Sequence, residues 1–404
     1  MSSLDTVELL PEPEDSRILS AIDPSAVGFQ DDWRAEITGW APLKPTPISR
    51  VRGKKFLVTN SILFAIFAVL MLWVWQSGYF VVELPPEKSE WAFSQAGFDE
   101  PILDGLTGEG IKVCIVDTGI DLSNPAFNGV DIIFEDLIGN SNTPVDYGYL
   151  SHGTMMAGLL ISQNHQLGMA PNIELGVVAA LGDDGTGKNT ADESTVSDAI
   201  TWCIDQFSAD IISLSLGGTQ PENMGREGPS ASVTRKALDK GIYVIAAAGN
   251  DGGVNDDGRV SVPSNVPGAI SVGASVRGGG VWENSSLGNQ VLTNGQDRQS
   301  PDFKPEIIAP GESIISTGIG DTWYSSSGTS DSTVFVTAAL ALILEDQPNF
   351  KPNMDSTDSC IKVIKEALKL STEGGGISHN DRSGYGELNA GEWLKEVQKM
   401  PACQ

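Results

Sequence analysis

Three short segments of the chain carry the side chains needed for a nucleophilic reaction at a carbonyl group. Asp117 ends an apolar run just before Gly119, His152 precedes a helical run, and Ser330 opens another. A serine hydroxyl becomes a strong nucleophile only when a base takes its proton, and an imidazole has a suitable pKa for that task. A carboxylate behind the imidazole selects its tautomer and stabilises its protonated form. Together, the three residue types predict acyl transfer through a covalent intermediate.

Each segment has a simpler interpretation when it is taken alone. The turn after Asp117 is a common one, a histidine before a glycine means little, and Ser330 could merely help to cap a helix. The conjunction is more specific, because ligands of open parallel sheets collect beyond the carboxyl ends of the strands, where Asp117 would lie. At a helix start, Ser330 would be close to backbone N–H groups that stabilise a developing oxyanion.

The elements that must position these residues alternate between strand and helix. Apolar runs predict strands at residues 112–116, 176–179, 210–216, 242–247 and 269–272, and helical patterns lie at 154–161, 195–207, 233–240 and 333–344. This alternation predicts an α/β fold with a mostly parallel sheet and helices on both faces. Several strand runs are apolar throughout, as a sheet covered on both faces requires.

The charge and the cysteines narrow the classes of protein to which the chain can belong. The formal net charge is -28, from 53 acidic and 25 basic residues, which argues against a nucleic-acid-binding protein. The cysteines do not have the spacing of a metal site. Cys114 lies in an apolar run and Cys203 in a helical pattern, so we expect both to be small buried hydrophobic residues. Cys360 and Cys403 could form a disulfide in an oxidising compartment.

The N-terminal part of the chain has a different organisation. Residues 1–50 are polar and rich in proline, which predicts a disordered cytoplasmic arm. Basic residues and an uncharged run from Phe56 to Trp75 follow, so residues 51–82 are predicted to hold a transmembrane helix that anchors the protein. A signal peptide and a buried core helix are the alternatives. By the positive-inside rule, residues 83–404 would form a catalytic domain outside the cytoplasm.

The segments around the candidate residues resemble the catalytic segments of the subtilisin family, the subtilases. They read VDTGID, SHGTMMAG, AAAGN and SSGTS, and segments such as ADIISLSLGG and IIAPGESIIST match the family in its order, over roughly Trp91 to Leu394. The resemblance implies a subtilisin-like three-layer sandwich and a serine endopeptidase. Carried over, Asp117 would orient His152, His152 would be the general base, and Ser330 the nucleophile. Asn250 would be the side-chain donor of the oxyanion hole, beside the backbone N–H of Ser330.

Two further segments resemble the substrate-binding edges of the family, and they comprise Gly185, Thr186 and Gly187, and Ser215, Leu216 and Gly217. A peptide clamped between them would gain main-chain hydrogen bonds, so the implied partner is a polypeptide substrate in an extended conformation. Carboxylates near these edges, at Asp183, Asp184 and Asp251, add the hypothesis of a mild preference for basic side chains.

The chain departs from the family pattern directly after the implied nucleophile. Where subtilases usually continue with methionine and alanine, this chain has Asp331. The carboxylate would oppose the charge of an oxyanion if it pointed there, and it would have little effect if it pointed into solvent. The alternative to an active enzyme is therefore a catalytically attenuated pseudoprotease that acts as a peptide-binding scaffold.

Two other properties of the family are not carried over. The loop at residues 162–167 is shorter than the loop that binds calcium in many bacterial members, so a structural calcium stays open as the only cofactor. The paired Asp256 and Asp257 lack regular ligand spacing and are predicted to lie in a solvated loop. The segment from Val82 to Trp91 is too short for the folded inhibitory propeptide that often precedes the catalytic domain.

Overall fold

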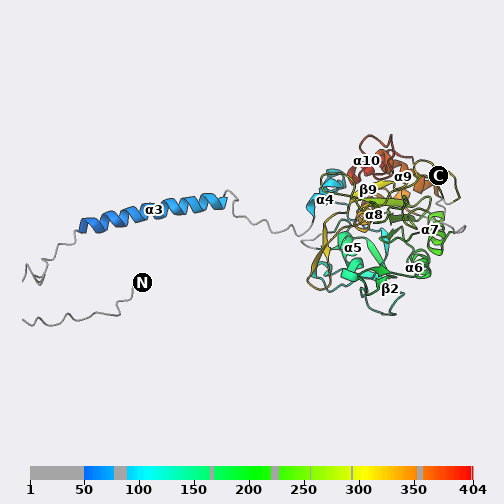
Figure 1. Ribbon diagram of the computed structural model, residues 1–404, viewed down its shortest axis with the longest axis horizontal. Helices are drawn as coiled ribbons and strands as arrows, with labels where there is room; N and C mark the ends of the chain where they lie inside the picture. Colours follow the sequence, from blue (N-terminus) through cyan, green and yellow to red (C-terminus); the bar gives the residue numbers. More distant parts are fainter. Residues whose placement is uncertain are drawn as a thin grey trace, which may run out of the picture. The chain divides into compact units, whose positions relative to one another are not determined.

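The computed structural model describes residues 50–76, 89–163, 168–219, 227–254, 256–292, 294–352, 358–401 and 403. The chain divides into two units, Met1–Glu83 and Leu84–Gln404 (Figure 1). Residues 1–49, most of the predicted arm, lie outside the described residues, as does most of the loop at 162–167.

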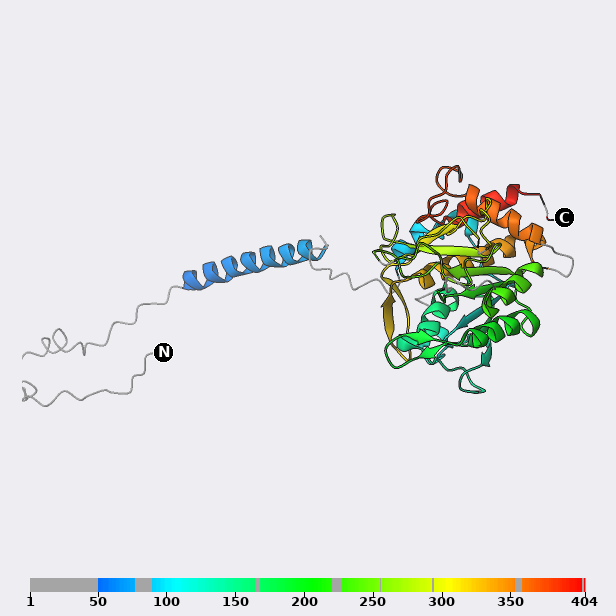
Figure 2. The ribbon, with the colours of Figure 1, turned by 45° about the vertical axis from the view of Figure 1, so that its right-hand side comes forward.

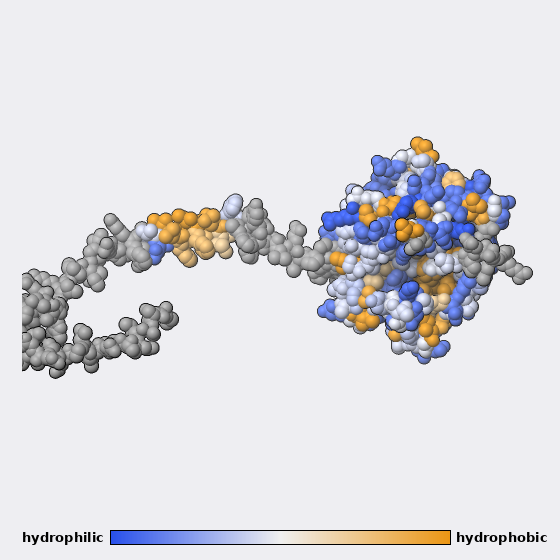
Figure 3. All heavy atoms as spheres, viewed as in Figure 1, coloured by the Kyte–Doolittle hydropathy of each residue, from blue (hydrophilic) through white to orange (hydrophobic). Residues whose placement is uncertain are grey.

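The first unit contains helix α3, Arg50–Gln76. Its side chains are described from Thr59 to Trp73, and the apolar ones from Ile62 to Trp73 are almost all more than half exposed. The hydrophobic colour of Figure 3 covers this part of the helix. Within the described residues, no helix has the length and apolar character needed to cross a membrane.

The second unit is built on a parallel sheet, which has seven strands within the described residues, in the order β2-β3-β1-β6-β7-β8-β9. The bounds are β1 Lys112–Asp117, β2 Ile132–Asp136, β3 Glu174–Ala179, β6 Ile211–Leu214, β7 Tyr243–Ala247, β8 Ile270–Ser275 and β9 Ile307–Pro310. The predicted parallel sheet is confirmed. Strands β2 and β9 were not predicted, and the strand predicted at 210–216 ends at Leu214.

Helices pack against the sheet in two groups. Helix α5 packs on α8, and α6 packs on α7, while strand β1 contacts both α5 and α6. Every residue of α8 from Thr329 to Leu344 is buried, which suits a helix that is apolar on nearly all sides. The helices are α4 Glu90–Gln95, α5 His152–Ile161, α6 Glu193–Asp205, α7 Pro229–Asp239, α8 Thr329–Asp346, α9 Asp358–Leu370 and α10 Ala390–Lys399.

Smaller elements complete the unit. They are the short helices η1 Pro101–Leu103, η2 Pro125–Phe127, η3 Tyr149–Ser151 and η5 Pro348–Phe350, the pair β4 Gly182–Asp183 and β5 Asn189–Thr190, and the hairpin β10 Ile314–Thr317 and β11 Trp323–Ser326. The beginning of helix α10 contacts the end of helix α4, so late and early parts of the unit meet. Ala390 donates its backbone N–H to the carbonyl of Ala96 at 2.8 Å, and the Lys395 ammonium lies 2.9 Å from the Glu100 carboxylate.

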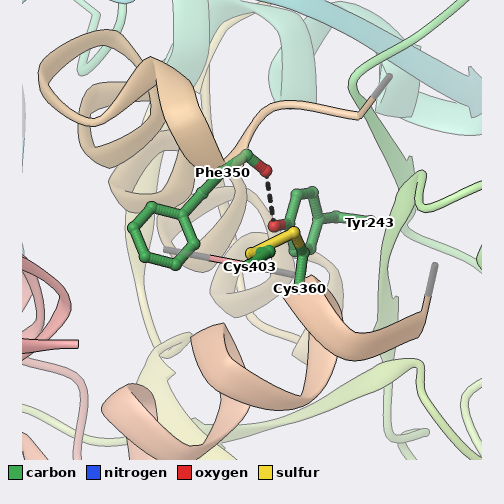
Figure 4. Close-up of a disulfide and its surroundings, with 4 residues drawn as sticks. All are labelled: Tyr243, Phe350, Cys360 and Cys403. Carbon is green, nitrogen blue, oxygen red and sulfur yellow. Dashed lines mark hydrogen bonds between the residues drawn. A yellow bond between two sulfur atoms is a disulfide. The ribbon is translucent and has the colours of Figure 1, made fainter. Parts of the chain in front are cut away.

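Disulfides join distant parts of the chain. Cys114 on β1 and Cys203 on α6 are both fully buried, as expected, but they form a disulfide across a Cα–Cα distance of 5.8 Å. Their interpretation as plain hydrophobic residues is therefore wrong, because α6 packs directly over β1. Cys360 and Cys403 form the second disulfide, beside the hydrogen bond from the Tyr243 hydroxyl to the Phe350 carbonyl (Figure 4).

Candidate active site

A carboxylate and an imidazole meet at the carboxyl end of β1, an inner strand of the sheet. Asp117 is the last residue of β1 and is 2% exposed, and its Oδ1 lies 2.8 Å from His152 Nδ1, at the start of α5. The same oxygen accepts the backbone N–H of Thr118 at 2.7 Å. With Nδ1 held by the carboxylate, Nε2 is the ring nitrogen left to exchange a proton with another group.

The charges around His152 favour its protonated form. Burial acts against the imidazolium, but the negative charge of Asp117 and its hydrogen bond, followed by the charges of Asp331 and Asp146, raise the pKa of His152 to about 9. Burial of an imidazole alone would lower its pKa, so the carboxylates outweigh desolvation here. The arrangement therefore suits a base whose protonated state must be stabilised during a reaction.

Asp146 joins the segment of Asp117 to the segment of His152. One carboxylate oxygen accepts the Thr118 hydroxyl at 2.7 Å, and the other accepts the backbone N–H and the hydroxyl of Thr154 at 2.8 and 2.5 Å. The backbone before His152 is unusual as well, since Leu150 and Ser151 have φ values of 52° and 54°. Conformations in that region cost energy for residues with a Cβ, and the Asp146 contacts help to hold them. Asp146 was not identified from the sequence. Its position shortly before His152 was the one feature that could have indicated it.

Ser330 lies in the first turn of α8 and is buried. Its hydroxyl donates to the backbone carbonyl of Ser215 at 3.1 Å, and the Ser215 hydroxyl donates in return to the carbonyl of Ser330 at 3.1 Å. Among the hydrogen bonds of the described residues, none joins Ser330 to His152. The structure thus pairs Asp117 with His152, and it pairs Ser330 with the segment that was predicted to bind substrate.

Asn250 lies beside the start of α8. Its Oδ1 accepts both the backbone N–H and the hydroxyl of Thr329 at 2.9 Å. Its amide nitrogen lies next to Gly328, where an added Cβ would be 3.2 Å from Nδ2. Gly249, just before it, has φ +119° and would place a Cβ 2.5 Å from the hydroxyls of Ser261 and Ser286, so glycine is required there. The amide N–H₂ of Asn250 is therefore fixed beside Gly328, two residues before Ser330.

The structure excludes the solvent-facing orientation of Asp331 that was considered from the sequence. The side chain is 1% exposed, and Oδ1 accepts the hydroxyl of Ser326 at 2.5 Å. Burial raises the pKa of the carboxyl to about 6, against the hydrogen bond from Ser326 and the charge of His152, which lower it. Asp331 is thus a buried neighbour of the imidazole.

The two predicted substrate edges lie in different surroundings. Residues 185–187 are in the turn between β4 and β5, and residues 215–217 follow β6 directly. Leu216 and Gly217 line a cleft of about 780 Å³, and residues 185–187 do not. Of the three carboxylates proposed to favour basic side chains, Asp251 lines the cleft. The other charged residues of the lining are Glu193, Glu227, Asp257, Arg235, Arg259 and Arg298. The lining therefore has mixed charge.

In the described part of the chain, no group of three or more His, Cys, Asp or Glu side chains could hold a metal ion. Asp256 accepts the backbone N–H groups of Gly258 and Leu287, and Asp257 accepts that of Arg259. These carboxylates therefore stabilise the turn at residues 256–259, and Asp256 also links it to Leu287.

Sequence comparison relates the chain to proteases of known type. The sequence model of the subtilase family matches residues 108–386. Subtilisin NAT from Bacillus subtilis subsp. natto is 33% identical over 252 residues, which are 61% of this chain and 58% of that protein. An intracellular serine protease from Paenibacillus polymyxa is 30% identical over 286 residues, 67% of this chain and 79% of that protein. The chain thus spans less than two thirds of the length of subtilisin NAT.

Solved structures share the fold of the second unit. A mutant of the protease domain of PatA aligns with a TM-score of 0.58 at 24% identity, covering 74% of this chain and 99% of that one. The prenylagaramide maturation protease PagA aligns with a TM-score of 0.56 at 23% identity, covering 73% of this chain and 96% of that one. At these identities the likeness concerns the fold alone.

Proposed function

The chain belongs to the subtilase family, and on this premise we propose that it is a serine endopeptidase that hydrolyses peptide bonds through an acyl-enzyme intermediate. The observation that carries the proposal is the 2.8 Å contact between the buried Asp117 carboxylate and His152 Nδ1. This contact leaves Nε2 of His152 as the base and places a negative charge behind it, as proton transfer from a serine requires.

Ser330 is the nucleophile in this proposal. In the free protein its hydroxyl donates to the Ser215 carbonyl, so it must exchange that bond for one to His152 Nε2 before it attacks. Catalytic hydrogen bonds are often long or misaligned without substrate and tighten when it binds. Attack on the carbonyl carbon then forms a tetrahedral intermediate, and His152 passes the proton to the leaving amine. Water, with His152 again as the base, then attacks the ester of the acyl-enzyme. His152 returns the proton to the Ser330 oxygen as the acid product leaves.

The oxyanion of the intermediate would be held by two donors. One is the backbone N–H of Ser330 in the first turn of α8, and the other is the side-chain amide of Asn250. The two bonds that Oδ1 of Asn250 accepts from Thr329 fix the amide plane, so that Nδ2 is the end free to donate. A donor oriented before the reaction stabilises the developing charge without reorganisation.

The proposed substrate is a polypeptide in an extended conformation. Backbone groups of residues 215–217 continue from β6 at the mouth of the cleft, and residues 185–187 would supply the opposite edge. Strand addition of this kind gains affinity from main-chain hydrogen bonds and specificity from side-chain pockets. A mild preference for basic side chains is part of the proposal, because Asp251 and three further carboxylates line the cleft beside three arginines.

A fluorophosphonate probe tests the proposed nucleophile directly, because it reacts covalently with an activated serine. The full chain should be labelled and should cleave an unfolded protein, and Ser330→Ala should lose both properties. Ser325→Ala, an exposed serine on β11, is the matched control and should keep both. A folded, unsubstituted chain that is neither labelled nor active would favour the peptide-binding scaffold instead.

We also propose that the first unit anchors the protein in a membrane, with the second unit outside the cytoplasm. The support is the uncharged run from Phe56 to Trp75, the exposed apolar side chains of α3, and four preceding basic residues. Disulfides also suit an oxidising compartment. After alkaline carbonate extraction, the full chain should stay with the membrane fraction.

The matched variants for this experiment replace Leu63 and Leu70. Arginine at both positions should release the chain, since each charge at the centre of a span costs about 2.5–3.5 kcal/mol. Isoleucine at both should leave it in the membrane. Release of the unsubstituted chain by carbonate would contradict the anchor and leave the peptidase proposal intact.

A further inference from the structure

Asp331 is a buried carboxylate next to the proposed nucleophile, and the mechanism above does not use it. It lies in the first turn of α8 and its Oδ1 accepts the Ser326 hydroxyl. Ser326 ends β11, and it pairs with Ile314 of β10 across the hairpin. The carboxylate is therefore held between its own helix and the β10–β11 hairpin.

The same hairpin is fixed to the helix that begins with His152. Ser316 donates its hydroxyl to the Met155 carbonyl at 2.6 Å, and Thr317 donates to the Thr154 carbonyl at 2.8 Å. Figure 2 shows the hairpin, in gold, beside α5. A chain of contacts thus runs from Asp331 through the hairpin to the first turn of α5. This arrangement fixes the nucleophile helix, the hairpin and the imidazole helix relative to one another.

The charged groups that act on His152 are all carboxylates. Asp117 on β1 is bonded to it, and the charges of Asp331 on α8 and of Asp146 in the segment before α5 also raise its pKa. His152 is in turn the charged group that acts on Asp331. Of the three carboxylates, Asp117 is in direct contact and Asp146 is engaged with Thr118 and Thr154, whereas Asp331 is bonded to a single hydroxyl.

We propose that Asp331 is a positioning residue for the general base: its buried carboxylate stabilises the imidazolium form of His152 and thereby sets the lower pH limit of peptide hydrolysis. The proposal rests on the proposed peptidase function. It gives a role to the residue at which the chain departs from the usual family motif. The carboxylate acts here on the base, through space and through the rigid frame of α8, the hairpin and α5.

The order of the two ionisations supports this role. The pKa of Asp331 is raised by burial to about 6, and that of His152 is raised to about 9, so Asp331 is already anionic when His152 titrates. An anion near an imidazolium raises its pKa, and only the neutral imidazole of the free enzyme can accept the serine proton. Activity should therefore fall about tenfold for each pH unit below the pKa of His152.

The experiment compares Asp331→Asn with the unsubstituted full chain by measuring kcat/KM on a peptide substrate across pH. The acid limb of the variant should lie about one pH unit lower, because one of the charges that hold the proton has been removed. At pH values below its own acid limb, the variant should be up to about tenfold more active than the unsubstituted chain. Asp346→Asn, the same change at the other end of α8, is the matched control and should leave the limb in place.

A second readout does not depend on activity. With ¹⁵N-labelled histidine, the resonance lost in His152→Ala reports the protonation of His152, and its midpoint should fall in Asp331→Asn by the same amount as the limb. If that midpoint falls but no hydrolysis occurs in any variant, the peptidase proposal fails, and with it the pH limit of hydrolysis, whereas the stabilisation of the His152 imidazolium by Asp331 stands. If the enzyme is active and neither limb nor midpoint moves, the role of Asp331 is refuted.

Ser326→Ala separates the charge from the packing. This variant loses the hydrogen bond to Asp331 but keeps the carboxylate, so its acid limb should stay close to that of the unsubstituted chain. A shift equal to that of Asp331→Asn would instead assign the effect to a disturbed hairpin and would refute a role for the charge.

Discussion

Replacing His152 with alanine is expected to lower kcat by about a million-fold, the scale that the loss of the same group has in subtilisin itself. Without the imidazole, the Ser330 hydroxyl has the Ser215 carbonyl as its hydrogen-bond partner, and a carbonyl cannot take up a proton. The residual rate should exceed that of the uncatalysed reaction, because the oxyanion donors and the substrate edges remain. Steady-state hydrolysis of a peptide substrate measures the effect.

The double variant His152→Ala, Ser330→Ala gives a sharper test of the same mechanism. If the two residues act as one unit, the second substitution should cost almost nothing further, since either loss alone stops the transfer of the serine proton. His379→Ala is the matched control, because this histidine is bonded to Pro305 and packs on Phe303 and Tyr385, apart from the proposed site. Independent, multiplying losses for His152 and Ser330 would contradict a shared catalytic unit.

Removing the disulfide between Cys114 and Cys203 is expected to lower the free energy of unfolding by about 4–5 kcal/mol. The bond closes a sequence separation of 89 residues, so the unfolded chain gains much freedom when the bond is absent. Urea denaturation of the full chain in detergent, comparing Cys114→Ala, Cys203→Ala with the unsubstituted protein, measures the change. Activity should fall at denaturant concentrations that the unsubstituted chain tolerates, because β1 ends at Asp117.

The other disulfide provides the comparison. Cys360 and Cys403 are separated by 43 residues, so Cys360→Ala, Cys403→Ala should cost slightly less, by roughly 0.6 kcal/mol on loop entropy alone. Reduction of the unsubstituted chain should then approach the combined loss of the two variants. Equal stability of the first variant and the unsubstituted, oxidised chain would show that the bridge between β1 and α6 does not constrain the unfolded state.

The sequence indicated the site because its chemistry is local. An apolar strand that ends in Asp117 and helices that begin near His152 and Ser330 can each be identified from a few neighbouring residues. The order of strands in a sheet is not local, so the sequence alone could not place α6 over β1 or pair Cys114 with Cys203. Likewise, Asp331 could be identified as unusual, but its orientation depends on a hairpin that was not predicted.

The hydrogen bonds of the candidate active site also divide into those that the sequence predicted and those that it did not. The pairing of Asp117 with His152 is the one that the resemblance to the family implied. The bond of Ser330 to the Ser215 carbonyl was not implied, because it depends on how closely α8 approaches the end of β6. Asp146 was missed for the same reason, since its partners come from two segments that meet only in the folded unit.

The contact of α10 with α4 matters for the chain while it is still being synthesised. Ribosomes release a protein from its N-terminus, so Asp117 and His152 emerge well before Ser330, and the helix that begins at Ala390 follows later still. Until then Ala96 lacks the partner that closes the unit. Under the proposed mechanism, an emerging chain therefore has base and carboxylate but no nucleophile, and a growing copy of this protein would gain peptidase activity only after most of it has been made.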